Sequence, residues 1–323
     1  MSRQPIRIGA RGSKLSLAQS GHMQARIAHA LGAPLDAGPE EIASYAQLIP
    51  IVTSGDRIQD RRLMEIGGKG LFTKEIEEAL LDGRIDCAVH SLKDMPAELP
   101  PGLVLAATPE REDPRDAFIS KVAQRLEDLP QGARLGTASL RRQAQALHVR
   151  PDLDVVMLRG NVDTRLAKLE RGEADAILLA QSGLNRLGMG HIPQSWLDPL
   201  AAPPAPGQGA LAIESRAEDV DAPWLAAIRC RPTTIAVAAE RGALYALEGS
   251  CRTAVGAYGR LDGSRLTLLV EALSPDGVIR VRHEGEVVLT GDDDDAGQAL
   301  SLGLSLGAAV KAEGGDAIIA PTE

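Results

Sequence analysis

The chain has few aromatic residues, few cysteines and no long apolar run. Phe, Trp and Tyr make up 2% of its 323 residues, which leaves almost no rings on which nucleic-acid bases could stack. The formal net charge of -9 also disfavours general attraction to a phosphate backbone. These shortages argue against an Arg-rich nucleic-acid binder, and no nucleic-acid partner is expected.

The three cysteines, Cys87, Cys230 and Cys251, fit neither a disulfide framework nor a zinc site, because they are odd in number and widely spaced. The six histidines show no metal-ligand spacing, so no metal is expected. No apolar run reaches the roughly eighteen residues of a membrane span, and the first residues carry no secretory signal pattern. We therefore expect a cytoplasmic protein without a membrane partner and with at least one free thiol.

What the chain does have is an alternation of strand-like and helix-like segments. Apolar stretches typical of strands occur at 6–10, 45–55 and 85–92, and helical patterns begin near Ser13 and Thr73, which are candidate N-caps. The alternation restarts after the segment EREDPRDAF, with strands at 133–139, 154–160 and 175–180 and helices at 139–150 and 161–173. Such alternation predicts parallel βαβ units in two α/β domains.

The Pro- and Gly-rich segment 201–210 is too rigid and polar for a core element and indicates a crossing between domains. Beyond it come one more strand-like piece, a long helix, short strands with turns at LDGS and SPDG, and an Ala/Leu-rich helix, which is an α+β pattern. The sequence therefore predicts three domains, which are residues 1–109 with 210–228, residues 110–209, and residues 229–323.

The segment AVHSLKDMP places two charged residues just beyond a predicted strand. Pro96 prevents the strand from continuing, so Lys93 and Asp94 follow its carboxyl end, the edge at which open α/β sheets bind ligands. A cation and an anion in this position are either part of a site or an ordinary ion pair in a solvated turn. The segment alone leaves both readings open.

Three predicted strand-to-helix turns combine unpaired backbone N–H groups, a capping side chain and arginine, which together make an anion site. Their side chains are Arg11 and Ser13 in ARGSK, Thr137, Ser139, Arg141 and Arg142 in TASLRR, and Arg159, Asn161 and Arg165 in RGNVDTR. A single arginine near a helix start is more often solvated. Three such turns in two similar domains predict a ligand with several carboxylates or phosphates, for which the guanidinium fork is well suited.

Cys251 differs from the other two thiols. It lies in the loop-like segment LEGSCRTAVGAY, where Arg252 would favour the nucleophilic thiolate. Cys87 lies in an apolar strand and is expected in the core, and Cys230 shows no evident role.

Nine motifs together resemble the porphobilinogen deaminase family, in the family's order along most of the chain. They are ARGSKLSLAQ, VTSGD, GGKGLFTKEIEEALL, AVHSLKDMP, EREDPRDAF, GTASLRRQ, LRGNVDTRL, PGQGALAIE and EGSCRTAVGAY. The resemblance implies a transferase that joins four porphobilinogen molecules head to tail, releases ammonia at each step and yields hydroxymethylbilane for tetrapyrrole (haem) biosynthesis. It also implies an α/β fold of two periplasmic-binding-protein-like domains around a cleft, with a smaller α+β C-terminal domain.

The resemblance further implies a covalent dipyrromethane cofactor, bound by a thioether to Cys251, and a catalytic Asp94. This aspartate would hold pyrrole N–H groups, stabilise developing positive charge and pass a proton to the leaving amine. The implied cofactor-binding residues are Cys251, Lys93, Asp94, Ser139, Arg141 and Arg142. The implied substrate-binding residues are Arg11, Ser13, Lys69, Phe72, Arg159 and Arg165.

The expected partner is the small molecule porphobilinogen, whose two carboxylates explain the need for arginine, and the protein is expected to be a monomer. The alternative is a cytosolic organic-anion binding protein of the same two-domain architecture. Such a protein would need neither the third domain nor Cys251 and Asp94.

Overall fold

The computed structural model describes residues 4–57, 73–247, 253–292 and 294–318. Contacts between residues divide these into two units, each described here by itself. Unit 1 consists of the described residues up to 57, from 73 to 111 and from 210 to 234, and unit 2 of those from 112 to 209 and from 235 onward. One boundary between the units, at 209 and 210, falls inside the Pro- and Gly-rich segment.

Unit 1 is built on a five-stranded sheet with the strand order β2-β1-β3-β10-β4. The strands are β1 (Ile6–Arg11), β2 (Ala46–Ile51), β3 (Cys87–Ser91), β4 (Leu103–Ala107) and β10 (Leu211–Arg216). β1 runs parallel to β2 and β3, which confirms the predicted βαβ pattern there. β10 runs antiparallel to both β3 and β4, so the sheet is mixed rather than wholly parallel.

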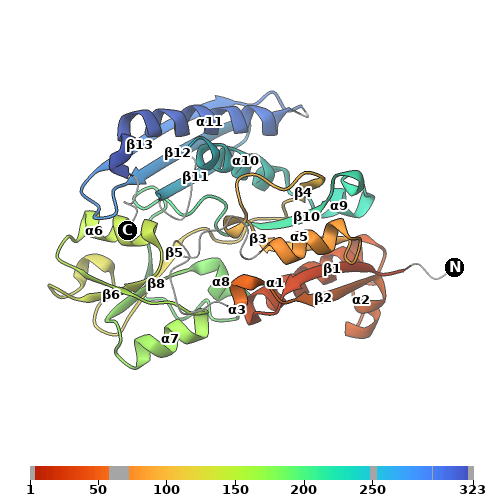
Figure 1. Ribbon diagram of the computed structural model, residues 1–323, viewed down its shortest axis with the longest axis horizontal. Coiled ribbons are helices and arrows are strands. Elements are labelled where there is room, and N and C mark those ends of the chain that lie inside the picture. Colours follow the sequence, from red (N-terminus) through yellow and green to blue (C-terminus); the bar gives the residue numbers. More distant parts are fainter. Residues whose placement is uncertain (1–3, 58–72, 248–252, 293, 319–323) are drawn as a thin grey trace. The chain divides into compact units, whose positions relative to one another are not determined.

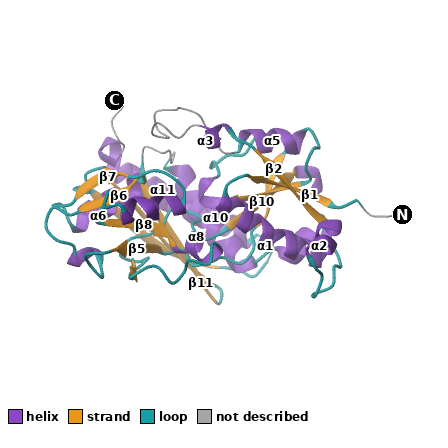
Figure 2. Ribbon diagram, turned by 90° about the horizontal axis from the view of Figure 1, so that it is seen from below, coloured by secondary structure: helices purple, strands orange, loops and turns teal. Residues whose placement is uncertain are grey.

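Helices cover both faces of this sheet (Figure 2). They are α1 (Lys14–Ala30), α2 (Pro39–Tyr45), α3 (Ser54–Arg57), α5 (Lys74–Leu81) and α9 (Pro223–Ile228). On one face Met23 and Ile27 of α1 pack with Ile8, and on the other Ile76 and Leu80 of α5 form a separate apolar cluster. Burial on both faces explains why β4, with the sequence LVLAA, is a continuous apolar run.

The predicted cap of α1 is confirmed, because the Ser13 hydroxyl accepts a hydrogen bond from the Ser16 N–H at 3.3 Å. The predicted cap of α5 is wrong. Thr73 already has helical backbone angles, with φ -119° and ψ -28°, and its side chain makes no capping bond. Glu75 instead accepts a hydrogen bond from the Ser54 N–H at 2.8 Å, which ties the start of α5 to α3.

Unit 2 contains a second five-stranded sheet with the order β7-β6-β8-β5-β9. Figure 1 labels β5, β6 and β8 of this sheet. Its strands are β5 (Asp116–Ser120), β6 (Arg134–Thr137), β7 (Asp154–Met157), β8 (Ala176–Ala180) and β9 (Ser195–Trp196). The helices beside it are α6 (Leu140–Val149), α7 (Val162–Glu170) and α8 (Gln181–Arg186). β6 runs parallel to β7 and β8, whereas β5 is antiparallel to β8 and β9. Every residue of β5 is buried, although the sequence pattern did not predict a strand there.

The remainder of unit 2 is an antiparallel sheet in the order β11-β12-β13, packed with two long helices. The elements are α10 (Arg231–Ala246), β11 (Ala254–Asp262), β12 (Arg265–Leu273), β13 (Arg280–Val288) and α11 (Asp295–Gly314). α11 approaches α10 so closely that a Cβ at Gly303 would lie 2.0 Å from the Ala239 carbonyl oxygen. The strands have nine residues each, longer than the short strands predicted, and the α+β pattern is confirmed.

Within the described part of the chain, no helix combines the length and the apolar character needed to cross a membrane.

Candidate functional site

At the carboxyl edge of the sheet in unit 1, strand β3 ends at Ser91 and passes directly into one 3-10 turn, Leu92–Asp94. Leu92 is buried, and its N–H donates to the Ala210 carbonyl at 3.1 Å, which fixes the turn beside β10. Asp94 is exposed and Lys93 is half-buried. The predicted place of both residues, just beyond the strand, is confirmed.

The turn after β1 lies at the same edge, because β1 and β3 are parallel neighbours. Arg11 is the last residue of β1, and Ser13 caps α1 directly after it. The Ser91 hydroxyl donates to Gln19 of α1 at 3.1 Å, which links this helix to the end of β3. Unit 1 therefore brings Arg11, Ser13, Lys93 and Asp94 to one sheet edge.

A buried polar cluster lies under this edge, and the sequence pattern did not single it out. His90 Nε2 lies 3.0 Å from Glu214 Oε2, and both side chains are buried. Glu77 of α5 is buried near them, and this burial, reinforced by the Glu214 carboxylate, raises the pKa of Glu77. The signal available in the sequence was one charged or polar residue inside each of two apolar strands, AVHSL and LAIES.

In unit 2, the candidate residues Arg141 and Arg142 are not solvated. Each is 5% exposed, and both bind the carboxylate of Asp116. Arg141 Nη1 donates to Asp116 Oδ2 at 2.7 Å, and Arg142 Nη2 donates to Asp116 Oδ1 at 2.7 Å. Asp116 begins β5, which is antiparallel, so it lies at the edge where β6 and β8 end. Ser139 caps α6 at this edge and accepts from the Arg142 N–H at 3.5 Å.

This cluster contains one carboxylate and two guanidinium groups. Burial by itself would raise the pKa of Asp116, but Arg141 and Arg142 outweigh burial and hold the pKa of Asp116 well below its ordinary value. A third donor, Gln208 Nε2, lies 2.9 Å from Asp116 Oδ1 and adds no charge. One positive charge is therefore left over, and Arg141 Nε is buried without a hydrogen-bond partner among the described residues. A buried surplus cation favours an anionic ligand, because unpaired buried charge is costly.

A third basic turn follows β7, the parallel neighbour of β6, and so lies at the same edge of unit 2. Asn161 caps α7 by accepting from the Thr164 N–H at 2.9 Å. Gly160 before it has φ +123°, a conformation that L side chains rarely adopt. Arg165 Nε donates to the Gly160 carbonyl at 2.8 Å, and Arg159 Nη1 is buried without a partner among the described residues.

The sequence pattern did not single out Arg186, the last residue of α8. Its Nη2 donates to the Gly209 carbonyl at 2.7 Å, and burial lowers the pKa of its guanidinium. No spacing or composition signal distinguishes this arginine from solvated ones.

Three candidate residues, Lys69, Phe72 and Cys251, lie outside the described residues. Of the two other thiols, Cys87 is fully buried, as expected, and this burial raises the pKa of its thiol. Cys87 is therefore a poor nucleophile. Cys230 is half-buried at the start of α10.

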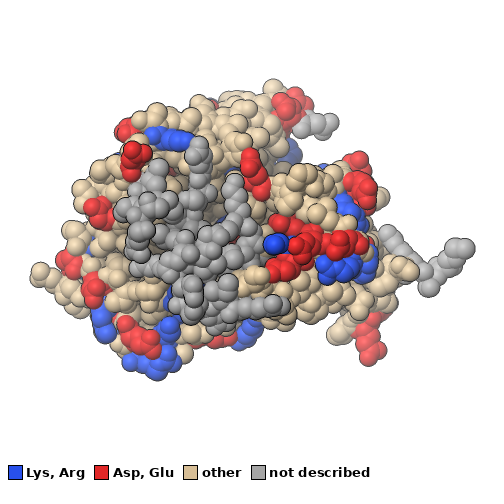
Figure 3. All heavy atoms as spheres, viewed as in Figure 1, with Lys and Arg blue, Asp and Glu red and all other residues tan. Residues whose placement is uncertain are grey.

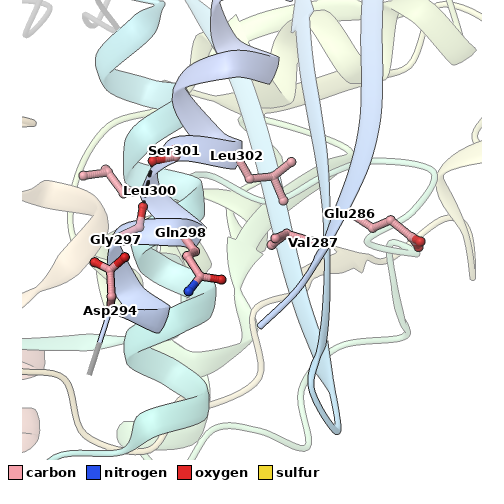
Figure 4. A pocket seen from close by; sticks show the side chains of 8 residues that line it. All are labelled: Glu286, Val287, Asp294, Gly297, Gln298, Leu300, Ser301 and Leu302. Atoms are coloured by element: carbon pink, nitrogen blue, oxygen red, sulfur yellow. Dashed lines mark hydrogen bonds between the residues drawn. The ribbon is translucent and has the colours of Figure 1, made fainter. Parts of the chain in front are cut away.

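One pocket elsewhere in the described residues does not suit the same ligand. A pocket between α11 and β13 is lined by residues that include Glu286 and Asp294 and no lysine or arginine (Figure 4). On the face shown in Figure 3, acidic and basic side chains are interspersed. The described residues contain no group of three or more His, Cys, Asp or Glu side chains that could hold a metal ion.

The sheets and their edges define a mixed α/β protein with arginine-bearing strand-to-helix turns. Comparison with known proteins narrows this class. The family described as "Porphobilinogen deaminase, dipyromethane cofactor binding domain" matches residues 6–223, and "Porphobilinogen deaminase, C-terminal domain" matches residues 234–312. The chain belongs to the porphobilinogen deaminase family, which confirms the resemblance seen in the motifs and the dipyrromethane cofactor that it implied.

Curated relatives match over nearly the whole length. Porphobilinogen deaminase from Caulobacter vibrioides (strain NA1000 / CB15N) is 81% identical over 322 residues, which cover 99% of this chain and 100% of the relative. Porphobilinogen deaminase from Phenylobacterium zucineum (strain HLK1) is 69% identical over 320 residues, with coverage of 99% and 100%.

Similar solved structures are more distant. One is a YaeC-family lipoprotein from Enterococcus faecalis, with a TM-score of 0.41 and 13% identity, covering 72% of this chain and 94% of that one. Another is a TRAP periplasmic solute binding protein from Desulfovibrio salexigens, with a TM-score of 0.39 and 11% identity, covering 70% and 72%.

Proposed function

We propose that the protein condenses four porphobilinogen molecules head to tail, releases one ammonia at each step and yields hydroxymethylbilane. The observation that carries this proposal is the full-length similarity to porphobilinogen deaminases, at 81% identity over 99% of the chain. The surplus positive charge beside Asp116 supports it, because each porphobilinogen unit adds two carboxylates that need cationic partners.

The cofactor is proposed to be held through a thioether to Cys251, with its carboxylates bound by Arg141, Arg142, Ser139 and Lys93. When bound, dipyrromethane supplies the pyrrole to which the first substrate molecule is joined. The chemistry of the residues present fits such a group, since α6 offers a capped helix start and two guanidinium groups that share one carboxylate. Arg11, Ser13, Lys69, Phe72, Arg159 and Arg165 are proposed to bind substrate.

Asp94 is proposed as the catalytic carboxylate. It accepts hydrogen bonds from pyrrole N–H groups, stabilises the positive charge that develops when the amine departs, and carries a proton to that amine. Its exposed position on a turn fixed by Leu92 supports this role, because the carboxylate is accessible while its backbone is held.

We also propose the three domains read from the sequence, which are residues 1–109 with 210–228, residues 110–209 and residues 229–323. The protein is further proposed to act as a cytoplasmic monomer. Light scattering of the purified protein tests the monomer, and a mass of twice the chain would contradict it.

The proposed function is tested by intact-protein mass and by product analysis. Protein made with ample porphobilinogen should be heavier than its polypeptide by two linked pyrrole units, and Cys251→Ser should lack the increment. Ammonia and hydroxymethylbilane should both form from porphobilinogen. Binding of porphobilinogen without ammonia release would favour the organic-anion binding protein instead, and an adduct on Cys230 would refute the assignment of Cys251.

A further inference from the structure

A chain of buried hydrogen bonds connects the C-terminal sheet of unit 2 to the arginine pair of α6. Glu271 of β12 is 1% exposed, and its Oε2 accepts from Arg280 Nε at 2.7 Å and from Arg282 Nη2 at 2.6 Å. Its other oxygen, Oε1, accepts from Gln145 Nε2 at 2.9 Å. Gln145 Oε1 in turn accepts from Arg141 Nη1 at 2.8 Å. Two hydrogen bonds therefore separate the Glu271 carboxylate from the Arg141 guanidinium.

These contacts fix the orientation of the Gln145 amide. Its nitrogen donates to two acceptors, Glu271 Oε1 and the Pro203 carbonyl, the latter at 2.9 Å. Its oxygen must then face Arg141, which has only donors to offer. A reversed amide would place N–H groups against the N–H groups of Arg141 and an oxygen against a carboxylate. Glu271 and the Pro203 carbonyl thus together hold the amide so that Gln145 presents an acceptor to Arg141, and Glu271 is the charged member of the two.

The segment before the domain crossing is held by the same side chains. The Pro203 carbonyl also accepts from Arg141 Nη1 at 3.1 Å. The Ala201 carbonyl accepts from Arg280 Nη2 at 3.1 Å and from Arg282 Nη2 at 2.9 Å. Arg141 is therefore bound on one side to Asp116 and on the other to groups whose positions depend on Glu271 and its two arginines.

Apolar packing adds a second link between the same elements. Leu140 and Ala144 of α6 pack against Ala254 of β11 and Leu273 of β12. Ala254 is the first residue of the strand that follows Cys251 in the sequence. The helix that carries the arginine pair and the strand that follows the proposed cofactor cysteine thus share one contact surface.

We infer that Glu271 is a positioning residue for cofactor binding. Through the amide of Gln145 it sets the orientation of the Arg141 guanidinium. A residue of the C-terminal sheet thereby holds the arginine pair in position to bind the carboxylates of the dipyrromethane. This inference rests on the proposed function, in which Arg141 binds the cofactor. It assigns a role to a carboxylate that lies outside the proposed cofactor and substrate sets.

The test measures how fast apoprotein takes up dipyrromethane from preformed hydroxymethylbilane. The uptake is monitored as the increase in intact-protein mass. Glu271→Gln keeps the shape but offers a single oxygen to donors from Arg280, Arg282 and Gln145. We expect loading to slow about tenfold or more, the factor for one lost charge-assisted hydrogen bond. A second readout is the concentration of hydroxymethylbilane at which loading is half-maximal, which should rise more than the maximal loading rate falls, because Arg141 binds the carboxylates of the group being loaded.

Two comparisons separate positioning from loss of stability. Leu266→Ala removes a fully buried side chain at the other end of β12 and should lower the melting temperature while leaving the loading rate unchanged. Gln145→Leu breaks the link but leaves Glu271 with both of its arginines. If Glu271 acts through Gln145, the double variant Gln145→Leu with Glu271→Gln should load no more slowly than Gln145→Leu alone.

The inference is overturned if Glu271→Gln loads within twofold of the wild-type rate, or if Leu266→Ala slows loading as much as Glu271→Gln does. It is also overturned if the slowing by Gln145→Leu and the slowing by Glu271→Gln multiply in the double variant. Should Glu271→Gln fail to fold, Gln145→Leu decides alone, since slow loading supports the inference and wild-type loading refutes it. Wild-type apoprotein that takes up no dipyrromethane would instead refute the proposed function itself, before any variant is compared.

Discussion

Replacing Asp116 with Asn should destabilise unit 2 strongly, because it removes the carboxylate that the two buried guanidinium groups share. Asp116 accepts four hydrogen bonds, one from Arg141 Nη1, two from Arg142 Nε and Nη2, and one from Gln208 Nε2. Asn has the same shape but is neutral, and its amide nitrogen would face one of these donors. Two guanidinium groups would then be buried without the carboxylate that pairs with both of them.

Breaking a buried ion pair by removing one partner costs roughly 3–5 kcal/mol of unfolding free energy. For a unit of this size that corresponds to a fall of roughly 6–20 °C in melting temperature. Circular dichroism or differential scanning fluorimetry of Asp116→Asn and wild type measures the fall. A suitable control is Asp128→Asn, which breaks the exposed pair of Asp128 with Arg125 and should leave the melting temperature unchanged.

The difference in melting temperature between Asp116→Asn and wild type depends on pH in a way that follows from the lowered pKa of Asp116. Burial opposes ionisation of this carboxyl, but Arg141 and Arg142 outweigh burial. A carboxyl whose pKa is lowered on folding stabilises the protein above its unfolded pKa, and the stability is lost only as pH falls through the folded pKa. The difference between Asp116→Asn and wild type should therefore be constant from pH 5 to 8. A melting-temperature fall below about 2 °C, or one that shrinks steadily across this range, would refute the reasoning.

Three further outcomes are expected. Cofactor-loaded Asp94→Asn should turn over porphobilinogen roughly 10²- to 10⁴-fold more slowly than wild type, the usual range for a general acid or base, and a loss below tenfold would remove Asp94 from the chemistry. Arg165→Ala should lower kcat/KM about tenfold, and Arg165→Lys should not restore it fully because lysine lacks the guanidinium fork; unchanged kinetics for Arg165→Ala would contradict this. Burial raises the pKa of the Glu77 carboxyl above its ordinary value of 4.5, so the folded state binds the carboxyl proton more tightly than the unfolded state does. Wild type should therefore lose stability as pH rises from about 4.5. Glu77→Gln should therefore gain melting temperature relative to wild type between pH 4 and pH 8, and a constant or falling difference would show that Glu77 does not cause the loss.

Two features set by neighbours in the sequence were predicted correctly, and a third was not. The Ser13 cap needs only a hydroxyl at the residue before the helix and a backbone N–H three residues further on. The turn at Lys93 and Asp94 needs only a strand that a proline terminates. The Thr73 cap failed on local conformation, because helical backbone angles at that residue keep its hydroxyl from the capping position. A preference for capping residues does not specify backbone angles.

Features set by distant pairs were missed. Asp116 lies 25 residues from Arg141 in the chain, and Gln145 lies 126 residues from Glu271, so neither pairing has a sequence signal. The pattern TASLRR correctly indicated guanidinium groups at a helix start. It could not indicate that both are buried against a carboxylate from an antiparallel strand, since β5 enters the sheet from a segment that resembled a break between domains.

Two aspartates near sheet edges, Asp116 and Asp94, have opposite surroundings and therefore different proposed roles. Asp116 is buried between two guanidinium groups that hold its pKa well below the ordinary value, so it keeps its charge and is a poor proton acceptor at neutral pH. Asp94 is exposed on a turn held by Leu92, where a carboxylate is accessible to an incoming pyrrole and a departing amine. Each unit therefore supplies a different part of the proposed chemistry. In this proposal unit 2 supplies fixed positive charge for carboxylates, and unit 1 supplies the carboxylate proposed to move the proton.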